Sequence, residues 1–412
     1  NGIYLVKTVT SIDIGINPAD VIDKNKLLIN LKLIFPNKDY FLIKKKLMKG
    51  KFFKFEKQVS AENYEKIMLL GDKSIRAEEK LTRLYPQKNL FSHIIGQIDN
   101  DNNGISGLEK SFDTKLKEMK KPLQLTIDTN IQFLIREELI KFQPIFQNKG
   151  SAAILMDVNN GNILSMISLP DFNLNERKKI EDLNYINRAT KGVYELGSVF
   201  KTFTIASGLN EGLIEPNTQF ENLPKRLECA NRPIREYDDK MPSNLTTEQI
   251  LIRSGNIGSV RIAQAVGLEK FPSFLKSLGL LNKIKFDIEE VGQPIPFRWG
   301  KCKLATAAFG HGITTTPLQL AKGYAIVSNG GYNVTPTLIK KNYTDKKERL
   351  LKRGVSEKIN IILRKIVSSK EGTANFANID GYEIGGKTGT AQKSVNGIYS
   401  KNKVNTFAAV FP

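Results

Sequence analysis

Histidine and cysteine are scarce in this chain, which holds only His93, His311, Cys229 and Cys302 among its 412 residues. A zinc hydrolase is disfavoured, because its metal normally takes about three or four such ligands. A Ser-His-Asp triad is disfavoured too, since one histidine would have to reach both a serine and a carboxylate. We expect His93 to be a packed residue, and His311 is a weak candidate for substrate contact. The two cysteines could pair in an oxidising compartment. The sequence alone does not establish this pairing.

Long apolar runs, internal repeats and an acidic excess are also absent. No stretch of about 20 apolar residues occurs, so no membrane span is expected within these residues. The 62 Lys and Arg residues outnumber the 42 Asp and Glu residues, giving a net charge of +20. Such a balance suits nucleic acid, anionic lipid or an anionic polymer as a partner. Because no nucleic-acid module is evident and the lysines are spread along the chain, we expect no nucleic-acid partner.

Length and hydrophobic content predict two domains. A chain of 412 residues is too long for one ordinary domain, and 40% hydrophobic residues suffice for a substantial core. We place the domains at residues 1–120 and 121–412, with the boundary near Lys121-Pro122. No catalytic constellation is evident in the first domain.

Local patterns predict some of the secondary structure. In the first domain we expect a strand in residues 26–34 and a helix in the charged stretch 72–84. In the second domain residues 123–128 are strand-like, and a helix is expected to begin at Thr129.

Three short motifs follow one another in a fixed order: Ser198-Val-Phe-Lys201, Ser254-Gly-Asn256 and Lys387-Thr-Gly-Thr390. A serine and a lysine one helical turn apart lie on one face, so a neutral amine can take the hydroxyl proton as the serine attacks a carbonyl. Each motif alone carries little weight, because Ser-x-x-Lys also occurs at Ser273 and at Ser400. Only Ser198 is followed by the other two motifs in order.

The surroundings of the first and third motifs support this choice. Gly197 precedes Ser198, and apolar residues follow at helical spacing, which predicts a buried helix that begins near Ser198. A helix N-terminus favours a developing oxyanion. Residues 382–392 are expected to form a strand whose glycines let a peptide add along its edge. On that strand we expect Lys387 to attract a terminal carboxylate, with the nearby threonines as hydrogen-bonding groups.

This combination resembles the penicillin-binding proteins and serine β-lactamases, with Ser-Gly-Asn in place of Ser-Asp-Asn. Residues 104–113, 150–171 and 309–321 resemble class B penicillin-binding proteins, the monofunctional transpeptidases, and most of all their cell-division type. The resemblance implies an α/β (α+β) transpeptidase domain with a central antiparallel sheet and a helical subdomain. A mixed α+β pedestal or dimerisation-type domain would precede it. It also implies a C-terminal truncation, since a further strand and helix are expected after Pro412.

The implied reaction is peptidoglycan D,D-transpeptidation, which cross-links stem peptides in septal cell-wall synthesis and is blocked by β-lactams. Ser198 would form the acyl-enzyme after Lys201, with a pKa lowered by burial and by Lys387, takes its proton. Ser254 would relay a proton to the leaving nitrogen, while Asn256 would hold the substrate amide and orient Lys201. The residues expected to bind the substrate are Lys387, Thr388, Gly389 and Thr390, with the Thr390 N–H as an oxyanion donor. No metal or organic cofactor is expected.

The resemblance also implies partners and a location. Besides stem peptides and β-lactams, we expect a membrane glycosyltransferase of the shape and division family and other division proteins. A transmembrane helix before Asn1 would anchor the protein in the bacterial inner membrane, with the catalytic domain on the periplasmic side. Three alternatives remain open: a β-lactamase, a D,D-carboxypeptidase, or a β-lactam-sensing or scaffold protein. The acceptor amine and a role in division rather than elongation are also open.

Overall fold

The computed structural model describes residues 2–99, 101–176, 182–229, 233–341, 347–395 and 398–411. Its packing divides the chain into two compact units. The first comprises Asn1–Lys88, Asp99–Asn102 and Asn173–Arg177, and the second comprises Asn89–Ile98, Asn103–Phe172 and Lys178–Pro412. The boundary expected near residue 120 stays a prediction about functional domains. No helix among the described residues combines the length and the apolar character that a membrane span requires.

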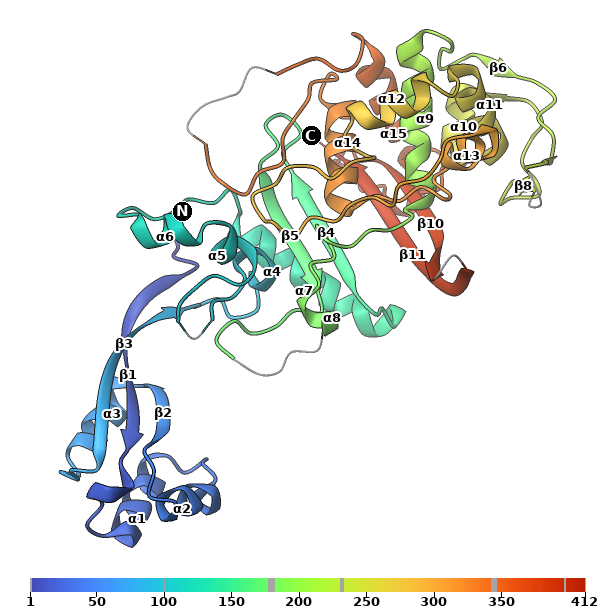
Figure 1. Cartoon of the computed structure of the whole chain (residues 1–412). Helices are drawn as coiled ribbons and strands as arrows, with labels where there is room; N and C mark the ends of the chain where they lie inside the picture. Colours follow the sequence, from blue (N-terminus) through green and yellow to red (C-terminus); the bar gives the residue numbers. More distant parts are fainter. Residues whose placement is uncertain are drawn as a thin grey trace. The chain divides into compact units, whose positions relative to one another are not determined.

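The first unit is built on a three-stranded antiparallel sheet in the order β2-β1-β3, drawn in blue in Figure 1. Its helices bury apolar residues against that sheet, with Ile14, Ile16 and Leu31 fully buried. The elements of this unit are β1 (Lys7–Ile16), η1 (Pro18–Asp20), α1 (Lys24–Ile34), α2 (Tyr40–Met48), β2 (Phe53–Val59), α3 (Ala61–Met68) and β3 (Ile75–Leu84).

Two predictions for this unit were wrong. Residues 26–34 belong to helix α1, not to a strand. The Asp23 carboxylate accepts hydrogen bonds from the backbone N–H groups of the first turn, and leucines recur at helical spacing on the buried side. The stretch 72–84 contains strand β3, not a helix. It pairs with β1 along ten successive residues, so tertiary pairing overrides the helical preference of its charged residues.

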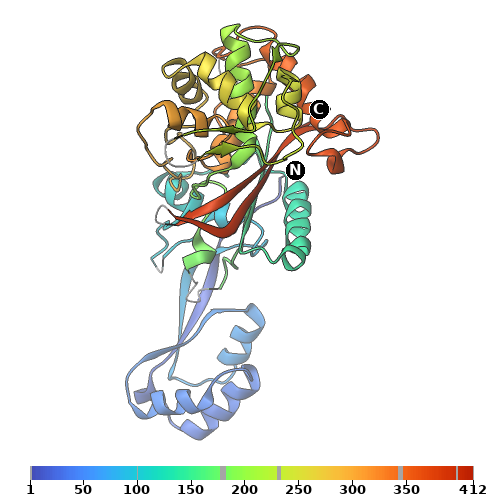
Figure 2. The same ribbon diagram turned by 90° about the vertical axis from the view of Figure 1, so that its right-hand side faces the viewer.

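The second unit is mixed α/β and carries its helices around two antiparallel strand pairs, β4-β5 and β10-β11. Figure 2 shows the β10–β11 hairpin in red. Its elements are α4 (Ser92–Ile95), α5 (Gly107–Ser111), α6 (Asp113–Glu118), α7 (Thr129–Phe146), β4 (Ser151–Met156), β5 (Ile163–Leu169), α8 (Asp182–Tyr185), η2 (Gly197–Phe200), α9 (Lys201–Glu211), β6 (Gln219–Phe220), β7 (Arg226–Leu227), β8 (Ile234–Arg235), β9 (Leu245–Thr246), α10 (Thr247–Ile252), α11 (Asn256–Val266), α12 (Lys270–Ser277), α13 (Lys301–Ala307), α14 (Pro317–Ser328), α15 (Val355–Ser368), η3 (Asn375–Ala377), β10 (Gly385–Val395) and β11 (Ile398–Val410).

Helix α9 is the centre of the core of this unit. Every residue from Lys201 to Leu209 is buried, and Phe203 packs edge-on against Phe200 and Tyr324. The helix predicted from Thr129 is present as α7, capped by the Asp128 side chain. Residues 123–128 form no strand and make a single bridge, from Leu125 to Ile339.

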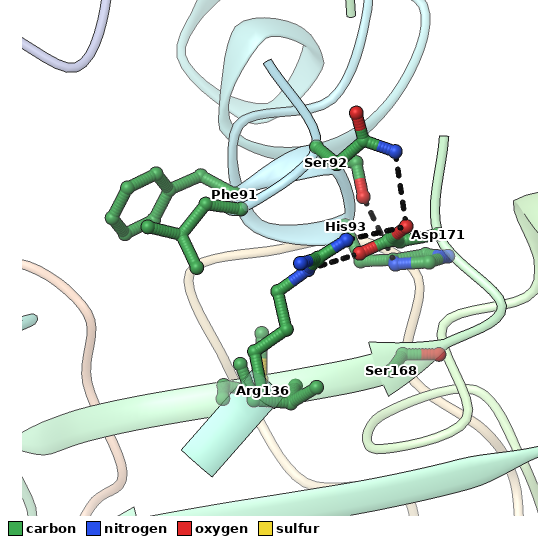
Figure 3. Close-up of a pocket in the computed structure, with 10 residues that line it drawn as sticks. Phe91, Ser92, His93, Arg136, Ser168 and Asp171 are labelled. Atoms are coloured by element: carbon green, nitrogen blue, oxygen red, sulfur yellow. Dashed lines mark hydrogen bonds and ion pairs between the residues drawn. The ribbon is translucent and has the colours of Figure 1, made fainter. Parts of the chain in front are cut away.

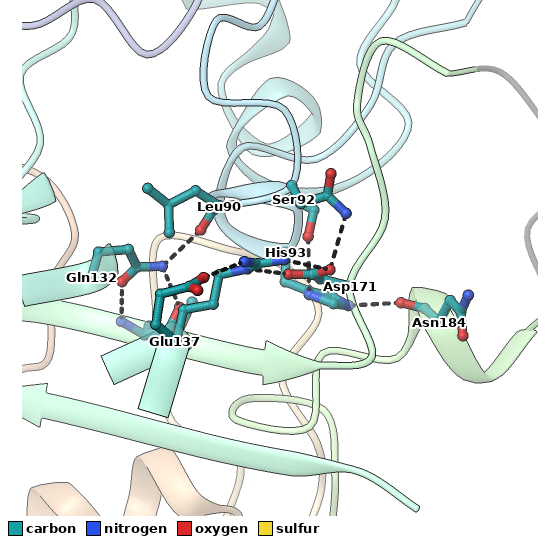
Figure 4. Close-up of polar contacts among 10 residues, drawn as sticks. Leu90, Ser92, His93, Gln132, Glu137, Asp171 and Asn184 are labelled. Atoms are coloured by element: carbon teal, nitrogen blue, oxygen red, sulfur yellow. Dashed lines mark hydrogen bonds and ion pairs between the residues drawn. The ribbon is translucent and has the colours of Figure 1, made fainter. Parts of the chain in front are cut away.

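A partly buried polar network ties residues 89–93 to α7 and to the segment after β5. Arg136 holds Asp171 through two nitrogens, at 2.7 and 3.3 Å, and Asn89 donates to the same carboxylate at 3.0 Å (Figure 3). The Gln132 side-chain amide donates a hydrogen bond of 3.0 Å to the Leu90 carbonyl (Figure 4). These contacts explain how a polar segment is held inside the fold.

His93 is a packed residue of this network, as the sequence predicts. Its Nε2 lies 2.8 Å from the Asn184 carbonyl oxygen (Figure 4). Its ring packs edge-on against Phe172. Burial lowers the pKa of His93 to about 4. The ring is therefore neutral at neutral pH.

Candidate active site

Ser198 lies in the turn η2, directly before helix α9. This is the position that the sequence predicts, near the N-terminus of a buried helix. The Tyr324 hydroxyl, from α14, donates a buried hydrogen bond of 2.9 Å to the Val199 carbonyl. This bond helps to fix the turn. The Ser198 side chain itself is half-buried, so a substrate carbonyl can approach it.

Three glycines bring this turn into contact with β10 and with the loop after α13. Gly197 has a positive φ of 65°, and a Cβ there would lie 2.6 Å from the Thr390 carbonyl oxygen. A Cβ on Gly310 would overlap the Gly197 carbonyl, and one on Gly389 would overlap the Leu196 carbonyl. Only glycine permits such backbone approach. The Ser198 turn and the Lys-Thr-Gly strand are therefore held side by side.

Lys201 lies at the start of α9, and only 1% of its surface is exposed. Its Nζ donates to both the backbone carbonyl and the hydroxyl of Ser254, the latter at 3.1 Å. The first two motifs are therefore joined through this amine. The Lys201 backbone N–H donates to the Ser198 carbonyl, but among the described residues no hydrogen bond joins the two side chains, although the residues lie one turn apart.

Asn256, which was expected to hold the substrate amide and to orient Lys201, bonds to a backbone carbonyl in the described structure, and its role toward the substrate stays a prediction. Its side-chain amide donates to the Arg235 carbonyl at 2.7 Å, so the group that orients Lys201 in the described structure is Ser254. Glu236, which follows β8, accepts hydrogen bonds from the backbone N–H groups of Asn256 at 2.6 Å and Ile257 at 2.8 Å. These bonds fix the first turn of α11.

The third motif lies on β10, which pairs with β11 along its length. Lys387 is fully buried and donates to the Thr388 carbonyl at 2.9 Å, while its Nζ lies 3.5 Å from the Thr373 hydroxyl. The Thr388 hydroxyl donates to the same Thr373 oxygen at 3.0 Å. Thr390 is exposed. The threonine side chains are thus closer to solvent than the lysine amine.

Burial makes both amines weakly basic, and repulsion by Lys387 adds to this effect at Lys201. Burial lowers the pKa of Lys387 to about 7. Burial also lowers the pKa of Lys201 well below its ordinary value, and the positive charge of Lys387 lowers it further, while Glu236 opposes this shift. A lysine needs such an environment to be neutral and act as a base.

Glu195, His311 and Tyr399 meet beside the Ser198 turn. The Tyr399 hydroxyl donates to Glu195 at 3.2 Å, and the rings of Tyr399 and His311 stack with centroids 4.8 Å apart. Glu195 also accepts from the Gly312 N–H at 2.9 Å. These contacts join the β10–β11 hairpin to the Ser198 segment, and they place His311 at the edge of the site.

The structure gathers the predicted residues Ser198, Lys201, Ser254, Lys387 and Gly389 around one point of the second unit. Sequence reasoning missed Thr373 and Glu236. Neither belongs to a recognisable short motif, and each lies far along the chain from the residue it contacts. A weak signal existed for Glu236, since an acidic side chain suits the N-terminus of the helix that Asn256 begins.

Comparison with known proteins agrees with this geometry. Residues 151–412 match the model of the penicillin binding protein transpeptidase domain, and residues 1–138 match the penicillin-binding protein dimerisation domain. A crystal structure of penicillin-binding protein 3 from Mycobacterium tuberculosis superimposes with a TM-score of 0.72 at 24% identity, covering 81% of each chain. That likeness supports the fold.

Curated relatives extend over most of the chain. The probable peptidoglycan D,D-transpeptidase FtsI of Caulobacter vibrioides is 31% identical over 86% of this chain and 62% of its own length. The peptidoglycan D,D-transpeptidase FtsI of Escherichia coli is 27% identical over 88% and 66%, and the stage V sporulation protein D of Bacillus subtilis is 28% identical over 98% and 69%. The chain thus spans about two thirds of the length of these relatives. Since the transpeptidase model alone covers more than half of its residues, the chain belongs to the penicillin-binding protein transpeptidase family.

Proposed function

We propose that this chain is the extracytoplasmic part of a class B peptidoglycan D,D-transpeptidase of the cell-division type. The observation that carries the proposal is the buried amine of Lys201, which has a lowered pKa, lies one turn from Ser198 and bonds to Ser254. A neutral amine in this place can accept the proton of a nucleophilic serine. The names of the relatives supply the substrate class.

In the first half-reaction the Ser198 oxygen attacks the carbonyl of the penultimate D-Ala of a stem peptide, and its proton passes to Lys201. The tetrahedral oxyanion is stabilised by backbone N–H groups at the start of the helical segment and by that of Thr390. When the C–N bond breaks, the proton reaches the leaving nitrogen through the Ser254 hydroxyl. Terminal D-Ala departs with that proton, and an ester on Ser198 remains.

In the second half-reaction an amine of a neighbouring stem peptide attacks the ester. Its proton returns through Lys201 to the Ser198 oxygen as the C–O bond breaks, and a new peptide bond joins the two stems. Water in place of the amine would give carboxypeptidase activity. A β-lactam would acylate Ser198 in the same way.

The substrate would be held along β10. This strand pairs only with β11 among the described strands, so its other edge can receive an extended peptide. The hydroxyls of half-buried Thr388 and exposed Thr390 would hydrogen-bond the terminal carboxylate, and Gly389 would let the chains approach closely. Lys387, buried behind them, would contribute charge rather than a direct contact.

The same assignment covers the rest of the protein. Residues 1–120 would form a pedestal and dimerisation-type domain, and residues 121–412 the transpeptidase domain. We further propose a membrane glycosyltransferase and other division proteins as partners. The inner membrane, with this part on the periplasmic side, is the proposed location.

Intact-mass spectrometry with benzylpenicillin tests the chemistry. We expect one stable covalent adduct, which Ser198→Ala and Lys201→Ala abolish. Ser273→Ala is the matched control, because Ser273 belongs to an exposed Ser-x-x-Lys sequence on α12 and should leave labelling unchanged. A transient adduct with released penicilloate would instead identify a β-lactamase. Labelling retained in Lys201→Ala would refute its role as the base. A cross-linking assay with stem peptides then separates a transpeptidase from a carboxypeptidase or a sensor.

A further inference from the structure

Glu236 is a carboxylate that the reaction described above does not use. It follows the short strand β8 and is half-buried. Its two oxygens accept hydrogen bonds from two successive backbone N–H groups, those of Asn256 and Ile257. The preceding carbonyl, that of Arg235, accepts from the Asn256 side chain. Two adjacent residues therefore hold the beginning of α11 through three hydrogen bonds.

The segment held in this way carries the acceptors of Lys201. Ser254 has a positive φ of 60°, a conformation that costs a non-glycine residue free energy unless the surroundings enforce it. Both its carbonyl and its hydroxyl accept from Lys201. Since Gly255 alone separates Ser254 from Asn256, bonds that fix Asn256 also restrict Ser254. A carboxylate at the N-terminus of an 11-residue helix is further favoured by the helix dipole.

Charge is the second link between Glu236 and the base. The charged groups that act on Lys201 are Lys387 from β10 and Glu236 from the segment after β8. Lys387 and burial favour the neutral amine, while Glu236 favours the charged amine and so raises the pKa of Lys201. A general base works best when its pKa is close to the working pH, and a lysine that is too weak a base transfers the proton poorly.

We propose that Glu236 is a positioning residue for acylation, which locks the Ser-Gly-Asn segment against Lys201 and supplies the negative charge that balances Lys387. This inference rests on the proposed function of Ser198 and Lys201. It assigns to Glu236 a role in the reaction without contact with the substrate.

The test compares Glu236→Gln and Glu236→Asp with the unaltered chain. We measure the second-order rate of benzylpenicillin acylation across the pH range in which the protein stays folded. Glu236→Gln should slow acylation by roughly tenfold to a hundredfold, the effect of misplacing catalytic groups by about 1 Å. It should also move the acidic limb of the pH profile to lower pH, because loss of the carboxylate lowers the pKa of Lys201. Glu236→Asp keeps the charge and should keep the limb in place.

Glu228→Gln is the matched control, because Glu228 is an exposed carboxylate of the same region, paired with Arg226. It should change neither the rate nor the limb. A purely structural cap would slow acylation in Glu236→Gln without moving the limb, and that result would overturn the proposal. An unchanged rate would do so as well.

A second measurement separates this proposal from the proposed function. Carbon-13 NMR of labelled lysine side chains follows the titration of Lys201 directly, with its signal assigned by loss in Lys201→Met. The midpoint should be lower in Glu236→Gln than in the unaltered chain, whether or not penicillin reacts. An equal midpoint in a folded variant would contradict the proposal, whereas absence of a penicillin adduct in the unaltered chain would contradict only the proposed function.

Discussion

Lys387 is a residue whose burial serves the site at the expense of stability. Its pKa of about 7 in the folded protein, against an ordinary 10.5, means that folding at neutral pH must neutralise or desolvate an amine. At about 1.4 kcal/mol for each pKa unit the cost is about 4 kcal/mol at neutral pH. The hydrogen bond to Thr388 offsets part of it.

Lys387→Met should therefore stabilise the protein at neutral pH by about 2 kcal/mol, after allowing for the carbonyl left without its donor. Between pH 7 and 10.5 the unfolded chain keeps the proton that the folded chain has lost, so the stability of the unaltered protein rises with pH. The advantage of the variant should shrink by about 1.4 kcal/mol per pH unit, vanish near the middle of this window and reverse toward its upper end. Urea unfolding at several pH values measures the difference in unfolding free energy between the variant and the unaltered protein. An advantage that does not change with pH would contradict this account.

At the scale of elements, the contact between η2 and β10 depends on glycines. Gly310→Ala would place a methyl group on the Gly197 carbonyl, which forces the Ser198 turn away from its neighbours. We expect a loss of about 1–3 kcal/mol in unfolding free energy and a clear loss of acylation rate. Gly300→Ala is the control, because a Cβ there meets nothing within 4 Å and its φ of −171° is extended backbone. If Gly310→Ala acylates as fast as the control, the close approach is not needed for the reaction.

The elements also show what could be predicted from the sequence. Helix α9 and strand β10 were predicted because each carries a motif within a clear apolar or glycine pattern. Strand β3 was not, because its charged residues become a strand only by pairing with β1. Contacts such as Glu236 with Asn256, or Thr373 with Lys387, join residues of different segments, and no local pattern encodes them. The sequence left the pairing of Cys229 with Cys302 open for the same reason, because the two cysteines belong to different segments.

At the scale of the molecule, one covalent link joins two distant segments of the second unit. Cys229, just after β7, and Cys302, in α13, form a disulfide across a sequence separation of 73 residues. In the chain-entropy model, closing a loop of this length stabilises a protein by about 4 kcal/mol. The β7–β8 segment that ends at Glu236 is thereby attached to the helical part of the unit.

Replacing both cysteines by alanine should lower the unfolding free energy by about 4 kcal/mol at most. Acylation should slow as well, because the segment before Glu236 loses an anchor. A reductant should destabilise the unaltered protein and leave the double variant unchanged. Alkylation of two free thiols in the native, unreduced protein would refute the pairing.

The backbone of Ser254 limits which amino acids can occupy that position. A φ of 60° is open to glycine, asparagine and aspartate at modest cost, but it is strongly unfavourable for β-branched residues. Threonine, the other small alcohol, is β-branched. Serine is thus the one small hydroxyl-bearing residue that satisfies both the backbone and Lys201. An exchange to threonine, which preserves the functional group, is for this reason a severe one.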